Sequence, residues 1–142
     1  MAAVNPNVVV LLSAGAPVET PWAGRCKALV YGALGGQAGA GAAADILTGK
    51  LCPCGKLSQT WAKAHDDTPA KANFGGEGRN VEYREGLYVG YRYYQTAGVK
   101  PAFPFGYGLS YTTFEYSALK ADETGVTLTV TNTGSAAGAE IV

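Results

Sequence analysis

The sequence has little charge, and its acidic and basic side chains cancel. Eleven Lys and Arg residues stand against eleven Asp and Glu residues, and together they make up only 15% of the 142 residues. This balance gives no electrostatic attraction to nucleic acid or to an anionic membrane. Long hydrophobic runs are also missing, because no apolar stretch reaches the roughly eighteen residues of a membrane span. We therefore expect no nucleic acid and no membrane as partners.

Residues that bind metals or form disulfides are scarce. The only cysteines are Cys26, Cys52 and Cys54, and an odd number with two of them two positions apart is a poor disulfide framework. A zinc site needs a fourth ligand at suitable spacing, and His65, on a polar stretch, is the single histidine available. We expect three reduced thiols, no metal and no cofactor. The N-terminus shows no basic segment before an apolar core, so we expect a cytoplasmic location.

The first half of the chain has the pattern of a parallel α/β sheet. Residues 7–12 and 27–34 are short apolar runs, as expected for strands buried on both faces. A glycine-rich turn then leads into an alanine-rich segment of high helix propensity, with Gly49 where the helix would end. Residues 55–61 could form one more strand. The order predicts a partial parallel sheet of about three strands with one main helix.

The middle of the chain changes to loop-forming and aromatic composition. Residues 62–82 are polar and glycine-rich without periodicity, which predicts a long surface loop. Residues 83–98 are dense in tyrosine and favour extended structure, with a short helical turn possible at 84–88. Residues 103–116 hold six aromatic rings among glycines, which ordinary hairpins and amphipathic helices do not show.

The last thirty residues have the pattern of an antiparallel sheet. Val126, Leu128 and Val130 alternate with threonines, which predicts a half-buried strand with the aliphatic side chains inward. Residues 113–119 and 139–142 would be its neighbours, as the first strands of an immunoglobulin-like or fibronectin type III-like β-sandwich. So few strands leave bare edges, and we expect poor solubility or self-association of the isolated chain.

Six motifs together resemble glycoside hydrolase family 3, the β-glucosidase family. They occur in the family's order and cover nearly the whole chain: NPNVVVLLSAGAPVETPW, LGGQAGAGAAADILTGK, CGKLSQTW, VEYREGLYVGYRYY, FPFGYGLSYTTFEY and VTNTGSAAGAEIV. The resemblance implies the C-terminal part of an α/β sandwich domain over residues 1–68. It implies a connecting loop and aromatic junction over 69–110, and a truncated fibronectin type III-like domain over 111–142. The aromatic stretch would then pack the two domains together at a sharp turn.

The resemblance also implies an activity for a larger protein. Family members are retaining glycosidases with two carboxyl groups about 5 Å apart across the scissile bond. The nucleophilic Asp belongs to an N-terminal barrel-like domain, and the acid/base Glu usually precedes the first motif. No residue of this chain matches either, so we expect no catalytic residue here. The chain would be a fragment, inactive alone, of an enzyme that hydrolyses terminal β-D-glucosyl residues, giving scaffold and part of the cleft wall.

One cluster could contact substrate. Glu82, Tyr83, Arg84 and Glu85 combine a ring that can stack on a sugar with carboxylates that accept hydroxyl protons. The alternative is that Glu82 or Glu85 pairs with Arg84 or with Arg92 and only fixes the junction.

Two other functions stay open for the chain. It could be a non-catalytic carbohydrate-binding or structural module. It could also be a minimal hydrolase using Glu82 and Glu85, although two residues three apart on one loop rarely reach opposite faces of a sugar. The adjacent Asp66 and Asp67 are typical of a solvated turn, and Asp45, on the expected helix, should face solvent or a nearby lysine.

Overall fold

The computed structural model describes all 142 residues, which group into two compact units. Unit 1 consists of Met1–Gly39 and Leu57–Tyr107, and unit 2 consists of Ala40–Lys56 and Gly108–Val142. Each unit is therefore built from two separate stretches of the chain. None of the helices has the length and apolar character that crossing a bilayer requires.

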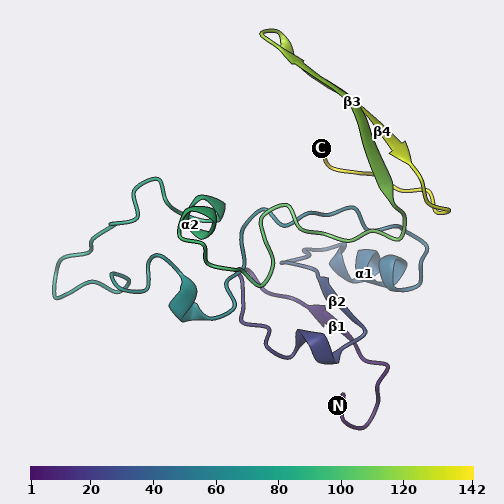
Figure 1. Cartoon of the computed structure of the whole chain (residues 1–142). Helices are drawn as coiled ribbons and strands as arrows, with labels where there is room; N and C mark the ends of the chain where they lie inside the picture. Colours follow the sequence, from purple (N-terminus) through teal and green to yellow (C-terminus); the bar gives the residue numbers. More distant parts are fainter. The chain divides into compact units, whose positions relative to one another are not determined.

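Two parallel strands form the sheet of unit 1. β1 (Val9–Leu12) pairs with β2 (Ala28–Tyr31), in register from Val9 opposite Ala28 onward, and a 3-10 turn, η1 (Ala23–Arg25), lies between them in the sequence. Figure 1 shows the two strands side by side. Both strands lie within the apolar runs that predicted them, so these two parallel strands are confirmed. The burial predicted on both faces is wrong, because the two-stranded sheet leaves Val9 51% and Leu11 47% exposed.

The third parallel strand predicted over residues 55–61 is wrong. Trp61 instead makes an isolated antiparallel bridge to Phe103, and the amide of Leu57 donates to the carbonyl of Tyr107 at 2.8 Å. This segment pairs with the aromatic stretch, which runs in the opposite direction, and so does not extend the sheet. Trp61 is 2% exposed and packs edge-on against the rings of Tyr31 and Phe103, at 4.9 and 6.1 Å between centroids. It is the centre of the small core of unit 1.

The rest of unit 1 is a long loop followed by a short helix. Residues 62–82 form the predicted loop, interrupted by a 3-10 turn, η2 (His65–Asp67), and Figure 1 shows the loop without any strand in it. The extended structure predicted over 83–98 is wrong where α2 (Tyr91–Thr96) forms. Tyrosine prefers strands only when a sheet can cover it. Here helical geometry buries Tyr94, which is 6% exposed.

The main predicted helix forms and, apart from its first residue, belongs to unit 2. α1 (Gly39–Leu47) ends where Gly49 adopts φ +74°, and its amide donates to the carbonyl of Ile46 at 2.9 Å. A left-handed glycine just past the last turn is a frequent helix end. Asp45 pairs with Lys50 at 3.0 Å, as the sequence indicated.

The predicted antiparallel strands form a hairpin in unit 2. β3 (Phe114–Asp122) pairs with β4 (Gly125–Asn132), and the register shifts between Ser117 and Lys120. Unit 2 contains no second sheet that could cover the hairpin. The aliphatic face predicted to be buried is accordingly open, with Val126 64% and Val130 37% exposed. The strand predicted over 139–142 is absent.

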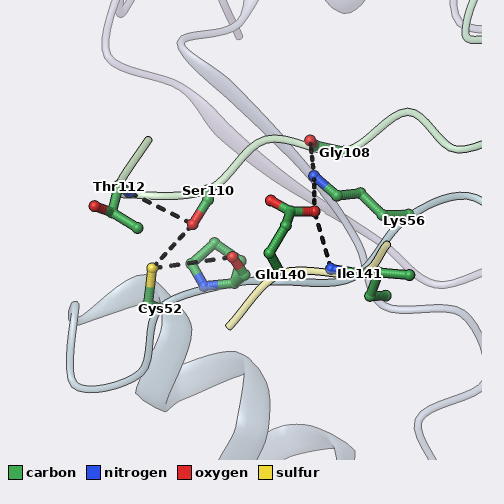
Figure 2. Close-up of polar contacts among 8 residues, drawn as sticks. Cys52, Lys56, Gly108, Ser110, Thr112, Glu140 and Ile141 are labelled. Carbon is green, nitrogen blue, oxygen red and sulfur yellow. Dashed lines mark hydrogen bonds and ion pairs between the residues drawn. The ribbon is translucent and has the colours of Figure 1, made fainter. Parts of the chain in front are cut away.

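Side-chain contacts hold the end of the chain in place of a strand ladder (Figure 2). Lys56 Nζ donates to the carbonyl of Gly108 at 2.9 Å and lies 3.1 Å from Glu140 Oε1. The hydrogen bond from Lys56 holds the pKa of Glu140 below its usual value, against the opposing effect of burial. Cys52 Sγ and Ser110 Oγ are 3.1 Å apart nearby. Glu140 thus ties residues 139–142 to Lys56 without the formation of a strand.

Candidate functional site

The four residues predicted to contact substrate lie in a turn region of unit 1 near its surface. Glu82 and Tyr83 directly precede the turn over residues 84–87, and the amide of Tyr88 donates to the carbonyl of Glu85 at 2.9 Å. Tyr83 is 87% exposed, so one ring face is free to stack on a flat apolar surface. Glu85 is half-buried, while Glu82 and Arg84 are exposed.

The structure brings Glu82 and Arg84 together. The guanidinium of Arg84 forms an ion pair and a hydrogen bond with the same carboxylate oxygen of Glu82. This is one of the pairings that the sequence left open. The carboxylate is paired with arginine on an exposed turn, whereas a glycosidase dyad has two carboxyl groups facing each other across the scissile bond. The turn can accept and donate hydrogen bonds to sugar hydroxyls, but it has no environment for a catalytic dyad.

Arg92 fixes this turn to the neighbouring helix α2. Its Nε donates to the carbonyl of Leu87 at 2.7 Å, and its Nη1 donates to the hydroxyl of Tyr91 at 3.0 Å. The guanidinium also lies 5.0 Å from the centre of the Tyr91 ring, within cation–π range. Arg92 therefore does not pair with Glu82 or Glu85 and instead sets the position of the turn.

A cavity of about 430 Å³ lies beside α2, and sequence reasoning did not locate it. Tyr91 and Phe105 line it and stay 41% and 53% exposed, with ring centroids 5.4 Å apart and planes tilted by 38°. Gln95 adds an amide, and Thr60 lines the wall with a buried hydroxyl that has no hydrogen-bond partner. The sequence signal for this cavity is the high density of aromatic residues at 91–94 and 103–107. From the sequence alone, the first stretch predicts extended structure and the second a domain junction.

A smaller cavity of about 170 Å³ shares Thr60 and Tyr94 with the first. Its polar side holds Glu19, whose Oε1 accepts a hydrogen bond from the backbone amide of His65 at 2.6 Å. Burial raises the pKa of the Tyr94 hydroxyl, and the nearby Asp67 raises it further. The four predicted residues line neither cavity. The turn and the cavities are thus separate features of unit 1.

The remaining candidate residues take structural positions. Asp66 pairs with Lys71 at 2.5 Å, and this hydrogen bond lowers the pKa of the carboxyl. Asp67 Oδ2 accepts the amide of Ala64 at 3.2 Å, and both aspartates lie in the η2 turn, as the sequence indicated. The structure places no three His, Cys, Asp or Glu side chains where they could hold a metal ion.

Fold and surface together define an α/β domain with a parallel strand pair, an antiparallel hairpin and aromatic cavities. The family model described as "Glycosyl hydrolase family 3 C-terminal domain" matches residues 1–111. The chain belongs to glycosyl hydrolase family 3, as the six motifs indicated, and its residues 1–111 correspond to the C-terminal domain of that family.

Known relatives align with the whole chain. Thermostable beta-glucosidase B of Acetivibrio thermocellus is 48% identical over 150 aligned positions, covering 100% of this chain. An exo-alpha-(1->6)-L-arabinopyranosidase of Bifidobacterium longum is 45% identical, again over 100% of the chain. The crystal structure of a family 3 beta-glucosidase of Bifidobacterium adolescentis superposes with a TM-score of 0.88 at 47% identity, over 94% of this chain.

The relatives are much longer than this chain. The chain spans 20% of each of the two curated relatives and 21% of the crystallised enzyme. The chain therefore corresponds to a small part of these longer relatives. Its α/β architecture agrees with the corresponding part of the crystallised enzyme.

Proposed function

We propose that this chain is the C-terminal scaffold of a retaining β-glucosidase-like glycoside hydrolase. Its similarity over its full length to Thermostable beta-glucosidase B carries the proposal. The residues of the chain supply no catalytic dyad, because the carboxylate of Glu82 is occupied by Arg84. The two catalytic carboxyl groups would come from elsewhere in the enzyme, including its N-terminal barrel-like domain. The full enzyme would release a terminal β-D-glucosyl residue through a glycosyl-enzyme intermediate.

Within that enzyme, the turn at 82–85 would form part of the cleft wall. The exposed ring of Tyr83 would stack on a sugar or aglycone face, and the Glu82–Arg84 pair would hydrogen-bond its hydroxyl groups. Arg92 supports this role because it anchors the turn at Leu87. The β3–β4 hairpin would be the first part of a fibronectin type III-like domain, which its antiparallel pairing supports.

A chimera tests the proposal. The segment of Thermostable beta-glucosidase B that aligns with this chain is replaced by the chain itself, and hydrolysis of an aryl β-glucoside is followed together with the anomer released. We expect hydrolysis with retention of the β-configuration. The isolated chain should show no turnover above buffer. A well-folded chimera without activity, or turnover by the isolated chain that is lost in Glu82→Gln or Glu85→Gln, would contradict the proposal.

The same chimera tests the cleft wall and the sugar. Tyr83→Ala should raise KM with little change in kcat, because a stacking contact binds ground state and transition state alike. Tyr88→Ala is the matched control, since Tyr88 is 55% exposed and lies just beyond the cluster. Equal kinetic parameters for the two variants would contradict a contact between Tyr83 and the substrate. Aryl xylosides, arabinosides and N-acetylglucosaminides assayed in parallel identify the preferred sugar.

The second candidate function is a non-catalytic carbohydrate-binding module, which the cavity beside α2 favours. Exposed aromatic rings beside an amide, as in Tyr91, Phe105 and Gln95, suit the apolar face and hydroxyl groups of a pyranose. Calorimetric titration of the isolated chain with methyl β-glucoside distinguishes the two functions. Binding that disappears in Tyr91→Ala would favour the carbohydrate-binding module. Absence of binding would favour the role as scaffold of a larger enzyme.

A further inference from the structure

Two free thiols lie two positions apart in the loop after α1. Cys52 and Cys54 flank Pro53, both side chains are half-buried, and neither takes part in a disulfide. Thiol–disulfide exchange requires that a reagent can reach the sulfur and that a second thiol lies nearby. This pair meets both conditions, and the proposed scaffold function gives it no role.

The backbone of this segment suits a bond between the two sulfurs. A residue before proline favours an extended conformation, in which the side chains of positions i and i+2 lie on the same side of the chain. The α-carbons of such a pair are at most about 7 Å apart, and the fixed φ of proline shortens this span. Disulfides join α-carbons up to about 6.8 Å apart.

The segment is also free to adjust. Residues 52–56 lie outside every helix and strand, and none of their amides or carbonyls takes part in a backbone–backbone hydrogen bond. A small change of conformation between α1 and Leu57 therefore breaks no ladder of hydrogen bonds. The two sulfurs can meet while the surrounding elements keep their pairing.

The sulfur of Cys52 joins separate segments of unit 2 in the reduced protein. Cys52 Sγ lies 3.1 Å from Ser110 Oγ, and Figure 2 shows the two side chains pointing toward each other. Gly138 packs so closely against this sulfur that an added Cβ would lie 3.2 Å from it. Little space remains there for a second sulfur, so Cys52 has to leave Ser110 in order to bond with Cys54.

We propose that Cys52 and Cys54 form a redox-active dithiol, which a low-molecular-weight disulfide such as oxidised glutathione converts into an intramolecular disulfide. The thiolate of one cysteine attacks a sulfur of the reagent and displaces a glutathione thiolate. The thiolate of the other cysteine then attacks the protein sulfur of this mixed disulfide and displaces the second glutathione. The dithiol thus loses two protons and two electrons, and the reagent gains both as it becomes two thiols.

Formation of the disulfide loosens unit 2. It separates Cys52 from Ser110 and removes one contact between the loop after α1 and the stretch that leads into β3. The new bond stabilises little in return, because a crosslink between residues two positions apart hardly restricts the unfolded chain. The oxidised chain is therefore less stable than the reduced chain.

Peptide mapping tests the bond on the folded 142-residue chain. The chain is incubated with oxidised glutathione, its remaining thiols are alkylated, and it is digested with trypsin. Cleavage after Lys50 and Lys56 leaves both cysteines in one peptide, residues 51–56. We expect this peptide to lose two hydrogen atoms and to take up no alkyl group. An unchanged dithiol, a lasting glutathione adduct on this peptide, or a bond to Cys26 overturns the proposal.

Thermal unfolding tests the effect on stability. The oxidised chain should unfold several degrees below the reduced chain, and dithiothreitol should restore the midpoint. Ser110→Ala keeps both thiols and lacks the contact, so oxidation should lower its midpoint less. The control Cys26→Ser keeps the pair and should respond like the wild type. An oxidised chain as stable as the reduced one, or an equal loss in Ser110→Ala, overturns the proposal. The test needs no glycosidase activity, so its outcome is separate from that of the proposed function.

Discussion

Lys56 Nζ lies 3.1 Å from Glu140 Oε1, and the two side chains are only 20% and 9% exposed. This is the least exposed ion pair of the chain, and it joins the loop after α1 to residues near the C-terminus. The hydroxyl of Tyr116 makes a further, smaller contribution to the lowered pKa of Glu140. Burial, followed by the charge of Glu140, raises the pKa of Tyr116.

The pair should make stability depend on pH in the acid range. The folded structure lowers the pKa of Glu140 from 4.5, chiefly through Lys56. A lowered pKa means that the stabilisation is present above 4.5 and is lost as the pH falls through the folded value. Glu140→Gln should therefore unfold at lower temperature than the wild type at neutral pH, and the gap should close in acid. Thermal unfolding followed by circular dichroism from neutral pH to about pH 3 measures this. Glu123→Gln, at the exposed hairpin turn, is the control, and a gap that persists in acid would exclude the pair as its cause.

Trp61 should dominate the stability of unit 1. Trp61→Ala removes its largest fully buried side chain and should lower the free energy of unfolding by about 3–5 kcal/mol. Trp61→Phe should cost less, because it keeps a ring and removes a buried indole N–H that has no acceptor. Urea unfolding measures both variants. Phe105→Ala, at a ring that is 53% exposed, is the control, and a loss equal to that of Trp61→Ala would contradict the assigned core.

Two glycines of the α1 region should respond to alanine with opposite sign. Gly49 has φ +74°, so Gly49→Ala should destabilise the chain by about 1–2 kcal/mol. Gly41 lies inside α1 with open space around an added methyl group, so Gly41→Ala should stabilise it by about 0.5–1 kcal/mol. Denaturant titration of the two variants provides the comparison. The same sign for both would mean that α1 does not end at this glycine.

Thr112 should stabilise the base of the hairpin through one hydrogen bond. It is 8% exposed, and its Oγ1 donates to Asn132 Oδ1 at 2.7 Å. Thr112→Val should cost about 1 kcal/mol, because Asn132 Oδ1 keeps the amide of Gly134 as a second donor. Thr127→Val on the exposed part of β4 is the control and should change little. Thermal unfolding measures both, and equal effects would argue against the bond.

The sequence predicted the elements whose signals are local. β1, β2, α1 and the hairpin each follow from a short periodic or apolar run with turn residues at its ends. The predictions failed where a distant partner decides the outcome. Residues 55–61 resemble a strand, yet Trp61 pairs with Phe103, more than forty positions away. Tyr91–Thr96 resemble a strand by composition and form α2, because burial of Tyr94 outweighs β-propensity.

In the candidate site, too, contacts between neighbouring residues could be predicted from the sequence, whereas contacts between distant segments could not. The Glu82–Arg84 pair could be anticipated, because its members are two positions apart on one turn. The cavity beside α2 could not, because Thr60, Tyr91 and Phe105 come together only through the folded arrangement of three segments. Aromatic density indicated that rings would gather, but it did not indicate which rings would leave one face exposed.

The discontinuity of the two units has a consequence for how this region can be recombined among relatives. The chain leaves unit 1 after Gly39, returns at Leu57, and leaves again after Tyr107. A single crossover near residue 111 would therefore take α1 and Lys56 from one parent and the hairpin with Glu140 from the other. In such hybrids, residues that contact each other within unit 2, such as Lys56 and Glu140, come from different parents. Exchange that keeps both units intact needs three crossovers, after residues 39, 56 and 107, so that residues 40–56 and 108–142 are inherited together.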